Sequence, residues 1–170
     1  MKPDDLMDDL MLPYRQFLNN HFFDKRLAHI LCIGALVPFV LLSLACWIVH
    51  PGWLGDVVRG QLSYGIAILS FTGGIHWGAA LLTGDMSGER TKKVLFWGIA
   101  PAILAWLAVL FDIGLGFLFS MICFIYSYRF DKRMYPQYHM PDWALKLRYR
   151  LTLIIVGAQL LTLIAVNVRV

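Results

Sequence analysis

The chain has 170 residues, of which 59% are apolar and only 15% are charged, whereas soluble domains usually carry about 25% charged residues. This composition is typical of an integral membrane protein and excludes an ordinary soluble domain. The formal net charge of +4 does not indicate a nucleic-acid-binding protein, because the basic residues flank apolar stretches and form no separate basic domain.

The first 26 residues predict a tail on the cytoplasmic side of the membrane. They open with MKPDDLMDDL, which holds aspartates where a secretory signal peptide would have an apolar core. Between Tyr14 and Phe22, aromatic and aliphatic residues recur at the spacing of one helix face, and polar residues take the opposite face. This pattern predicts a short amphipathic helix lying in the membrane interface.

Apolar stretches after this tail are long enough to cross the hydrocarbon core of a bilayer, which takes about 17–25 helical residues. They cover residues 27–49, 61–83, 94–111, 113–130 and 151–168. We therefore expect an all-α fold, namely an integral membrane bundle of five transmembrane helices with a short interfacial N-terminal helix. In this organisation residues 1–26 form the cytoplasmic tail and residues 27–170 form the membrane domain.

The positions of lysine and arginine predict the direction of these spans. With five spans, thirteen of the fifteen basic residues fall on one side of the membrane, in residues 1–26, 84–93 and 129–150. The other side carries only Arg59 and Arg169. Because positive residues gather on the cytoplasmic side, we expect a multi-pass protein of a bacterial inner membrane, with a cytoplasmic N-terminus and a periplasmic C-terminus.

One ionisable residue, His76, lies inside the second predicted span, in the stretch FTGGIHWGAALL. A rise of ~1.5 Å per residue puts it ~10 Å from the cytoplasmic end. An unpaired polar group in hydrocarbon costs several kcal/mol, so we expect a shared polar network at this depth. The candidate members of this intramembrane polar site are His76, Thr72, Gln159, Cys123, Trp77 and Gly34, whose carbonyl is freed by Pro38.

Four roles for His76 remain open at this point. It could be a structural hydrogen-bond donor between helices, a binding site for a small polar or quinone-like molecule, a haem ligand or a proton-transfer group. Haem would need a second axial ligand, and His29 lies nearer the surface. Proton relays usually include a carboxylate, and the predicted spans contain none. We therefore expect no cofactor, no metal and no catalytic residue.

Glycines surround His76 and predict close helix packing. Gly74 and Gly78 form a small-xxx-small pair, and Gly73 lies beside them. Small residues let neighbouring backbones approach in membrane proteins. We expect these three glycines to make the second span the central and most buried helix.

Several stretches resemble one known family. YGIAILSFTGGIHWG at 64–78, PAILAW at 101–106 and WALKLRYRLT at 143–152 are similar to the domain-of-unknown-function family 3429, whose animal relatives are called transmembrane protein 69. The GGIHWG motif is the specific part of this resemblance. The resemblance implies a small multi-pass protein of bacterial inner membranes, with mitochondrial relatives, and makes His76 and Trp77 the centre of its function.

The leading functional hypothesis is an accessory, assembly or stabilising subunit of a larger membrane complex. Such a subunit needs neither a wet path nor an acid, base or metal group. The alternatives are a binder or transporter of a quinone-like or polar solute centred on His76, and an enzyme acting on a lipid or quinone. We expect contact with the lipid bilayer and with a membrane-protein partner, through residues 14–22 or 134–143, and no nucleic acid.

Overall fold

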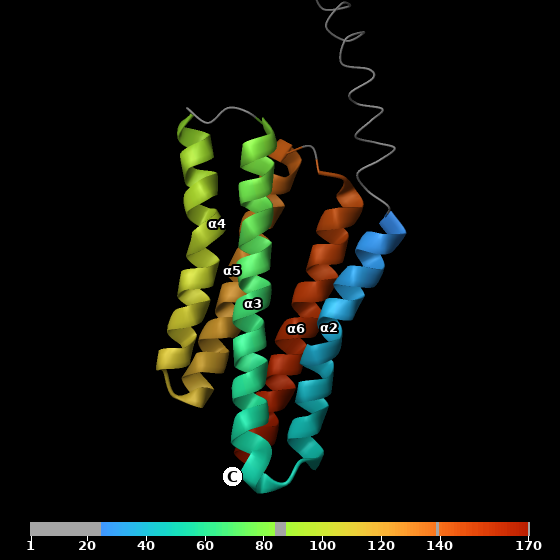
Figure 1. Ribbon diagram of the computed structural model, residues 1–170, viewed down its shortest axis with the longest axis vertical. Coiled ribbons are helices and arrows are strands. Elements are labelled where there is room, and N and C mark those ends of the chain that lie inside the picture. Colours follow the sequence, from blue (N-terminus) through green and yellow to red (C-terminus); the bar gives the residue numbers. More distant parts are fainter. Residues whose placement is uncertain (1–24, 84–87, 139, 170) are drawn as a thin grey trace, which may run out of the picture. The chain divides into compact units, whose positions relative to one another are not determined.

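The computed structural model describes residues 25–83, 88–138 and 140–169, and within these residues all regular structure is helical (Figure 1). The helices are α2 (Lys25–Ile48), α3 (Pro51–Thr83), α4 (Glu89–Leu107), the 3₁₀ helix η1 (Ala108–Leu110), α5 (Ile113–Met134), the 3₁₀ helix η2 (Tyr135–Tyr138) and α6 (Asp142–Arg169). The all-α class predicted from the sequence is thus confirmed. The amphipathic helix predicted between Tyr14 and Phe22 lies outside the described residues.

The chain forms two compact units, Met1–Gly34 and Ala35–Val170, so that α2 contributes to both. In the first unit, the start of α2 exposes apolar side chains such as Leu27, Ile30 and Leu31. The second unit contains the rest of α2, all of α3 to α6, and the buried core described below.

Four helical segments are long and apolar enough to cross a membrane. They are Lys25–Ile48, Thr91–Leu110, Ile113–Met134 and Asp142–Arg169. Their exposed surfaces carry large apolar side chains, among them Phe96 and Ile122, as a lipid-facing surface requires. The chain is therefore a membrane protein. The predicted count of five is not confirmed, because α3 is 33 residues long but its apolar character is diluted by glycines, Thr72 and His76.

Helix ends explain where the spans differ from the predicted ones. Proline lacks an N–H and suits the first helical position, so α3 begins at Pro51 and not at residue 61, and includes Arg59. The carboxylate of Asp112 accepts a hydrogen bond of 3.1 Å from the backbone N–H of Gly114 and caps α5. Helix α6 begins at Asp142 and not at residue 151, which brings Arg148 into the bundle.

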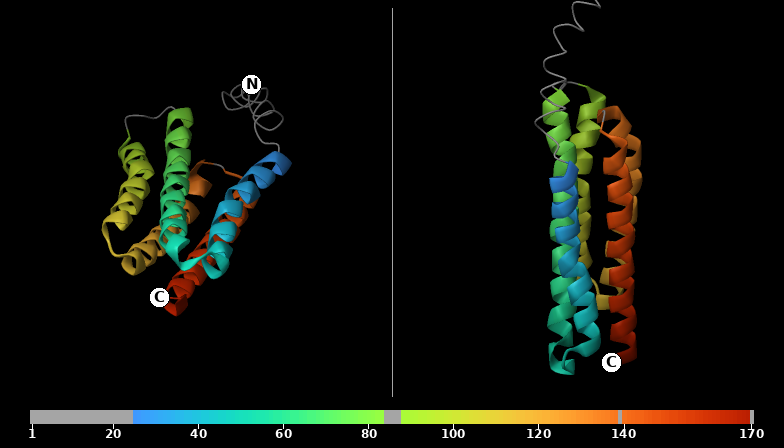
Figure 2. Two further views of the ribbon diagram at one scale, coloured as in Figure 1. Left: turned by 60° about the horizontal axis from the view of Figure 1, so that its bottom comes forward. Right: turned by 90° about the vertical axis from the view of Figure 1, so that its right-hand side faces the viewer.

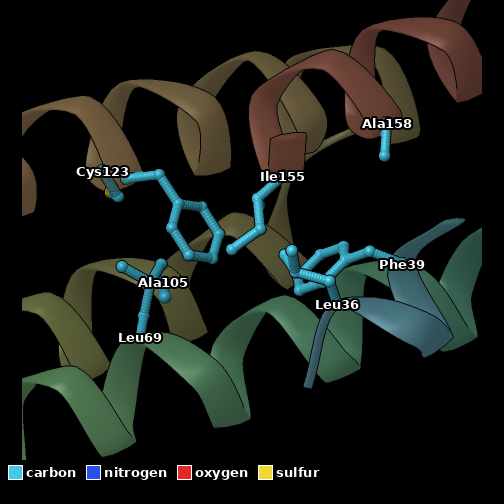
Figure 3. Packing of buried hydrophobic residues seen from close by; sticks show 8 residues of the cluster. Leu36, Phe39, Leu69, Ala105, Cys123, Ile155 and Ala158 are labelled. Carbon is cyan, nitrogen blue, oxygen red and sulfur yellow. The ribbon is translucent and has the colours of Figure 1, made fainter. Parts of the chain in front are cut away.

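Aromatic rings fill the centre of the second unit. The Phe39 ring meets the Tyr64 ring at 5.1 Å and the Phe124 ring at 6.0 Å, both edge to face. The surrounding cluster of buried side chains, shown in Figure 3, is Leu36, Phe39, Leu69, Ala105, Cys123, Phe124, Ile155 and Ala158. These residues come from all five long helices, so this cluster joins them in one core.

Helix α3 contacts α4, α5 and α6, and both views of Figure 2 show it side by side with α4. Gly73 lies against the backbone of α4, where an added Cβ would overlap the carbonyl oxygen of Gly98. Trp77 covers Gly98, and its indole Nε1 donates a 2.9 Å hydrogen bond to the carbonyl oxygen of Leu95. Two residues of the GGIHWG motif, Gly73 and Trp77, thus contribute to the contact between α3 and α4.

The other two glycines of the motif lie in a different environment. Gly74 and Gly78 are exposed, and an added Cβ at either would meet nothing within 4 Å. Of these three glycines, only Gly73 therefore requires a missing side chain.

This difference between neighbouring glycines predicts opposite effects of alanine. Gly73→Ala should lower the free energy of unfolding by about 1–3 kcal/mol, because the new methyl group would push α4 away. Gly74→Ala, its matched control, should be neutral or stabilising by up to about 1 kcal/mol, because alanine favours the helix. Detergent-micelle unfolding with increasing SDS measures both. Equal effects of the two substitutions would contradict the described packing.

Candidate functional site

Asp131 is the most deeply buried acid among the described residues, with 1% of its surface exposed. It lies in the last turn of α5 and uses both carboxylate oxygens. Its Oδ1 is 2.8 Å from Nε2 of His76 on α3. Its Oδ2 accepts a 2.6 Å hydrogen bond from Nε of Arg148 on α6. One carboxylate therefore joins three helices.

Arg148 is held in place by more than Asp131. Its side chain is 5% exposed, and its Nη2 donates a 3.1 Å hydrogen bond to the hydroxyl of Ser127, one turn before Asp131 on α5. Arginine is always charged in proteins and presents a rigid fork of donors. Asp131 and Arg148 thus form a buried ion pair with charge-assisted hydrogen bonds.

Aromatic rings enclose the His76 side of this cluster. His76 is 1% exposed, with the Phe130 ring edge-on at 5.3 Å and the Tyr135 ring at 6.3 Å. The Trp97 ring stacks on Phe130 at 4.3 Å. An ionised carboxylate only accepts hydrogen bonds, so the contact with Asp131 fits the His76 tautomer that has its proton on Nε2.

The energetic consequence is that Asp131, His76 and Arg148 depend on one another. Moving a charge out of water costs several kcal/mol, which only a close partner offsets. Removing one member of such a buried pair typically costs about 3–5 kcal/mol, since the other charge stays buried without compensation.

We call His76, Asp131, Arg148 and Ser127 the ion cluster.

The sequence expectation that His76 has no carboxylate partner is therefore wrong. Asp131 lies directly after the predicted fourth span, residues 113–130, and Arg148 is one of the basic residues that predict the topology. A hydropathy pattern predicts that a span ends where charged residues such as these begin. A helical pattern was nevertheless present, because Ser120, Ser127 and Asp131 are spaced by seven and four residues and share one buried face of α5.

The other residues of the predicted polar site are not members of the ion cluster. Thr72 is buried, but its hydroxyl donates to the carbonyl of Leu69 in its own helix, at 2.9 Å. Cys123 belongs to the apolar core. Gly34 ends the first compact unit, and Trp77 binds the α4 backbone as described above. Of the six predicted residues, the structure brings only His76 into the ion cluster.

Gln159 is fully buried in a second polar contact, deeper along α6. Its Nε2 donates a 3.0 Å hydrogen bond to the hydroxyl of Ser120, and Gly65 of α3 packs against this amide. Its Oε1 has no hydrogen-bond partner among the described residues. Glycine at position 65 leaves the room that this pair occupies, because a Cβ there would lie 3.3 Å from the amide nitrogen.

A third polar contact follows further along α6. The hydroxyl of Thr162 donates to Oε1 of Gln61 on α3, and Nε2 of Gln61 donates to the carbonyl of Phe39 at 3.3 Å. Ser43 on α2 donates to the carbonyl of Ala158 at 3.0 Å. One face of α6 therefore carries a series of buried polar contacts that begins at the ion cluster.

Comparison with known proteins agrees with the motif resemblance. The model of the family described as "Protein of unknown function (DUF3429)" matches residues 25–164. The chain belongs to this family. All members of the ion cluster lie inside the matched range.

Two curated relatives carry the name transmembrane protein 69. The protein from Xenopus tropicalis is 32% identical over 73% of this chain and 48% of its own length. The protein from Mus musculus is 25% identical over 80% of this chain and 55% of its own length. The chain thus spans about half the length of the curated relatives it matches. No solved structure matches it.

Proposed function

We propose that this chain is an accessory subunit that stabilises or assembles a larger membrane complex. The observation that supports this proposal is the ion cluster, whose polar groups are directed at one another. His76 and Asp131 are each 1% exposed, and both oxygens of Asp131 are bound within the protein. Such a cluster fixes the mutual positions of α3, α5 and α6, as a structural subunit requires.

Binding or catalysis at His76 fits this geometry less well. A histidine beside an aspartate also occurs in acid–base catalysis, and a carboxylate is what a proton relay requires. Here, however, Arg148 binds the second oxygen of Asp131, and the rings of Phe130 and Tyr135 lie over His76. A ligand would have to displace a charged partner to reach the imidazole. The proposal accordingly includes no cofactor and no reaction.

The surfaces proposed for the partner are residues 14–22 and 134–143. Both are rich in tyrosine, phenylalanine, methionine or tryptophan, which are residue types enriched in protein interfaces. The second surface begins beside the ion cluster, because the buried Tyr135 contacts His76 and the adjacent Pro136 is exposed. A partner at this end of the bundle would contact the turn that follows Asp131.

We further propose that α3 also crosses the membrane, which makes five spans in total, and that the chain is a bacterial inner-membrane protein. Its polar residues His76 and Gln61 are fully enclosed by neighbouring helices, so its moderate apolar character is compatible with a central position in the bundle. Five spans also gather thirteen of the fifteen basic residues on one side, which makes the N-terminus cytoplasmic and the C-terminus periplasmic.

This topology predicts opposite labelling of two introduced cysteines. Ser87→Cys should react with a membrane-impermeant maleimide only from the cytoplasmic side, and Val170→Cys only from the periplasmic side. Intact cells and inverted membrane vesicles provide the two directions. The parent protein, with its own three cysteines, is the background control. Labelling of both positions from the same side would contradict five spans.

The accessory role predicts that partner binding depends on the N-terminal segment and not on the histidine. Deletion of residues 1–23 should leave the protein in the membrane but remove a partner that co-purifies stoichiometrically with the full chain. His76→Gln, which keeps an amide donor for Asp131, should retain that partner. Quantitative pull-down from gently solubilised native membranes measures both. Retention of the same complex by both variants would contradict the proposed partner surface at 14–22.

A further inference from the structure

Two hollows share the stacked rings of Trp97 and Phe130 in their lining. The first, of about 430 Å³, is lined by Lys92, Lys93, Phe96, Trp97 and Phe130. The second, of about 570 Å³, is lined by Trp97, Ile125, Tyr126, Arg129, Phe130 and Arg133. Because both hollows are lined by Trp97 of α4 and Phe130 of α5, we consider them together as the Trp97–Phe130 cleft.

Four cations line this cleft. Lys92 and Lys93 lie near the start of α4, and Arg129 and Arg133 lie near the end of α5. All four are exposed. The polar rim therefore stands at one end of two membrane-spanning helices, where a bilayer places its headgroups.

Apart from Tyr126, the rest of the cleft is lined by apolar and aromatic side chains, two of which are also exposed on the lipid-facing surface. Phe96 is 76% exposed in the first hollow, and Ile125 is 43% exposed in the second. A water-soluble anion would pair with the cations but leave these side chains uncovered. An anionic lipid satisfies both surfaces, because its phosphate meets the cations and its acyl chains cover the apolar residues.

The floor of the cleft also carries an unsatisfied donor. The indole Nε1 of Trp97 is covered from solvent and has no hydrogen-bond partner among the described residues. Buried donors are nearly always paired in proteins. A phosphate or ester oxygen that displaces the atoms covering Nε1 would supply the missing acceptor.

We propose that the Trp97–Phe130 cleft binds one anionic diacyl phospholipid, with Lys92, Lys93, Arg129 and Arg133 around its phosphate. The bound lipid holds the start of α4 against the end of α5. Because Phe130 precedes Asp131 in the chain and its ring contacts His76, the lipid covers the aromatic side of the ion cluster. This site needs the membrane embedding of the chain but not its accessory role.

Native mass spectrometry of the purified full chain tests the proposal, with dioleoyl phosphatidylglycerol as the probe and dioleoyl phosphatidylcholine as the neutral lipid. Phosphatidylglycerol should bind at one preferred site. Each double variant, Arg129→Gln/Arg133→Gln and Lys92→Gln/Lys93→Gln, should weaken its binding about thirtyfold, as expected from the loss of two cations near a membrane surface.

Lys146→Gln/Arg150→Gln is the matched control, because it removes two exposed basic residues of α6 that line neither hollow. It should change the affinity less than twofold. Equal losses in the cleft variants and in this control would overturn the proposal. Equal binding of phosphatidylcholine to the unmodified chain would also overturn it, because the cations would then contribute nothing.

A second measurement locates the lipid. Phosphatidylglycerol with brominated acyl chains should quench tryptophan fluorescence of the chain, and Trp97→Phe should remove part of that quenching while keeping an aromatic ring in the cleft. Undiminished quenching in Trp97→Phe would overturn the site. Competition by sn-glycerol 3-phosphate as effective as by the intact lipid would show a site for soluble anions and would overturn the lipid assignment.

Discussion

The arrangement of the helices depends on how one buried carboxylate is neutralised. Asp131 binds His76, 55 positions away in the chain, and Arg148, 17 positions away. Because a carboxylate without partners is too costly to bury, α3, α5 and α6 must adopt the one arrangement that brings both partners to it. The ion cluster thereby fixes the position of each helix along the axis of its neighbours. Apolar contacts alone specify this axial position poorly.

The polar interior also accounts for the distribution of residue types over the bundle. Gln159 with Ser120, and Gln61 with Thr162, form further hydrogen-bonded pairs along α6, while large apolar side chains cover the outside of the helices. Lipid offers no hydrophobic driving force between helices, so buried hydrogen bonds and close backbone contacts such as Gly73 on Gly98 supply the association. An interior that uses its polar groups to hold itself together is consistent with a structural subunit.

Local patterns were enough to predict the all-α membrane class, the family and the burial of His76, but not its partners. Hydropathy identifies apolar runs, yet it places Asp131 and Arg148 outside them, because it treats every charge as the end of a span. Gln159 is buried and hydrogen-bonded, but to Ser120, since the choice of partner depends on helix rotation and not on depth alone. Likewise Gly73, and neither Gly74 nor Gly78, meets α4, and spacing within a glycine-rich stretch does not identify the contacting face.

A double-mutant cycle on Asp131 and Arg148 tests the central claim most directly. The free energy of unfolding in detergent micelles would be measured for Asp131→Asn, Arg148→Gln, the double variant and the parent chain. We expect a coupling energy of about 1–3 kcal/mol, because both substitutions remove the same ion pair. A parallel cycle combines Arg148→Gln with Asp112→Asn, which alters the carboxylate that caps α5. The effects of these two substitutions should be additive to within about 0.5 kcal/mol. Additivity of Asp131 and Arg148 to the same degree would contradict a bundle organised around a shared buried carboxylate.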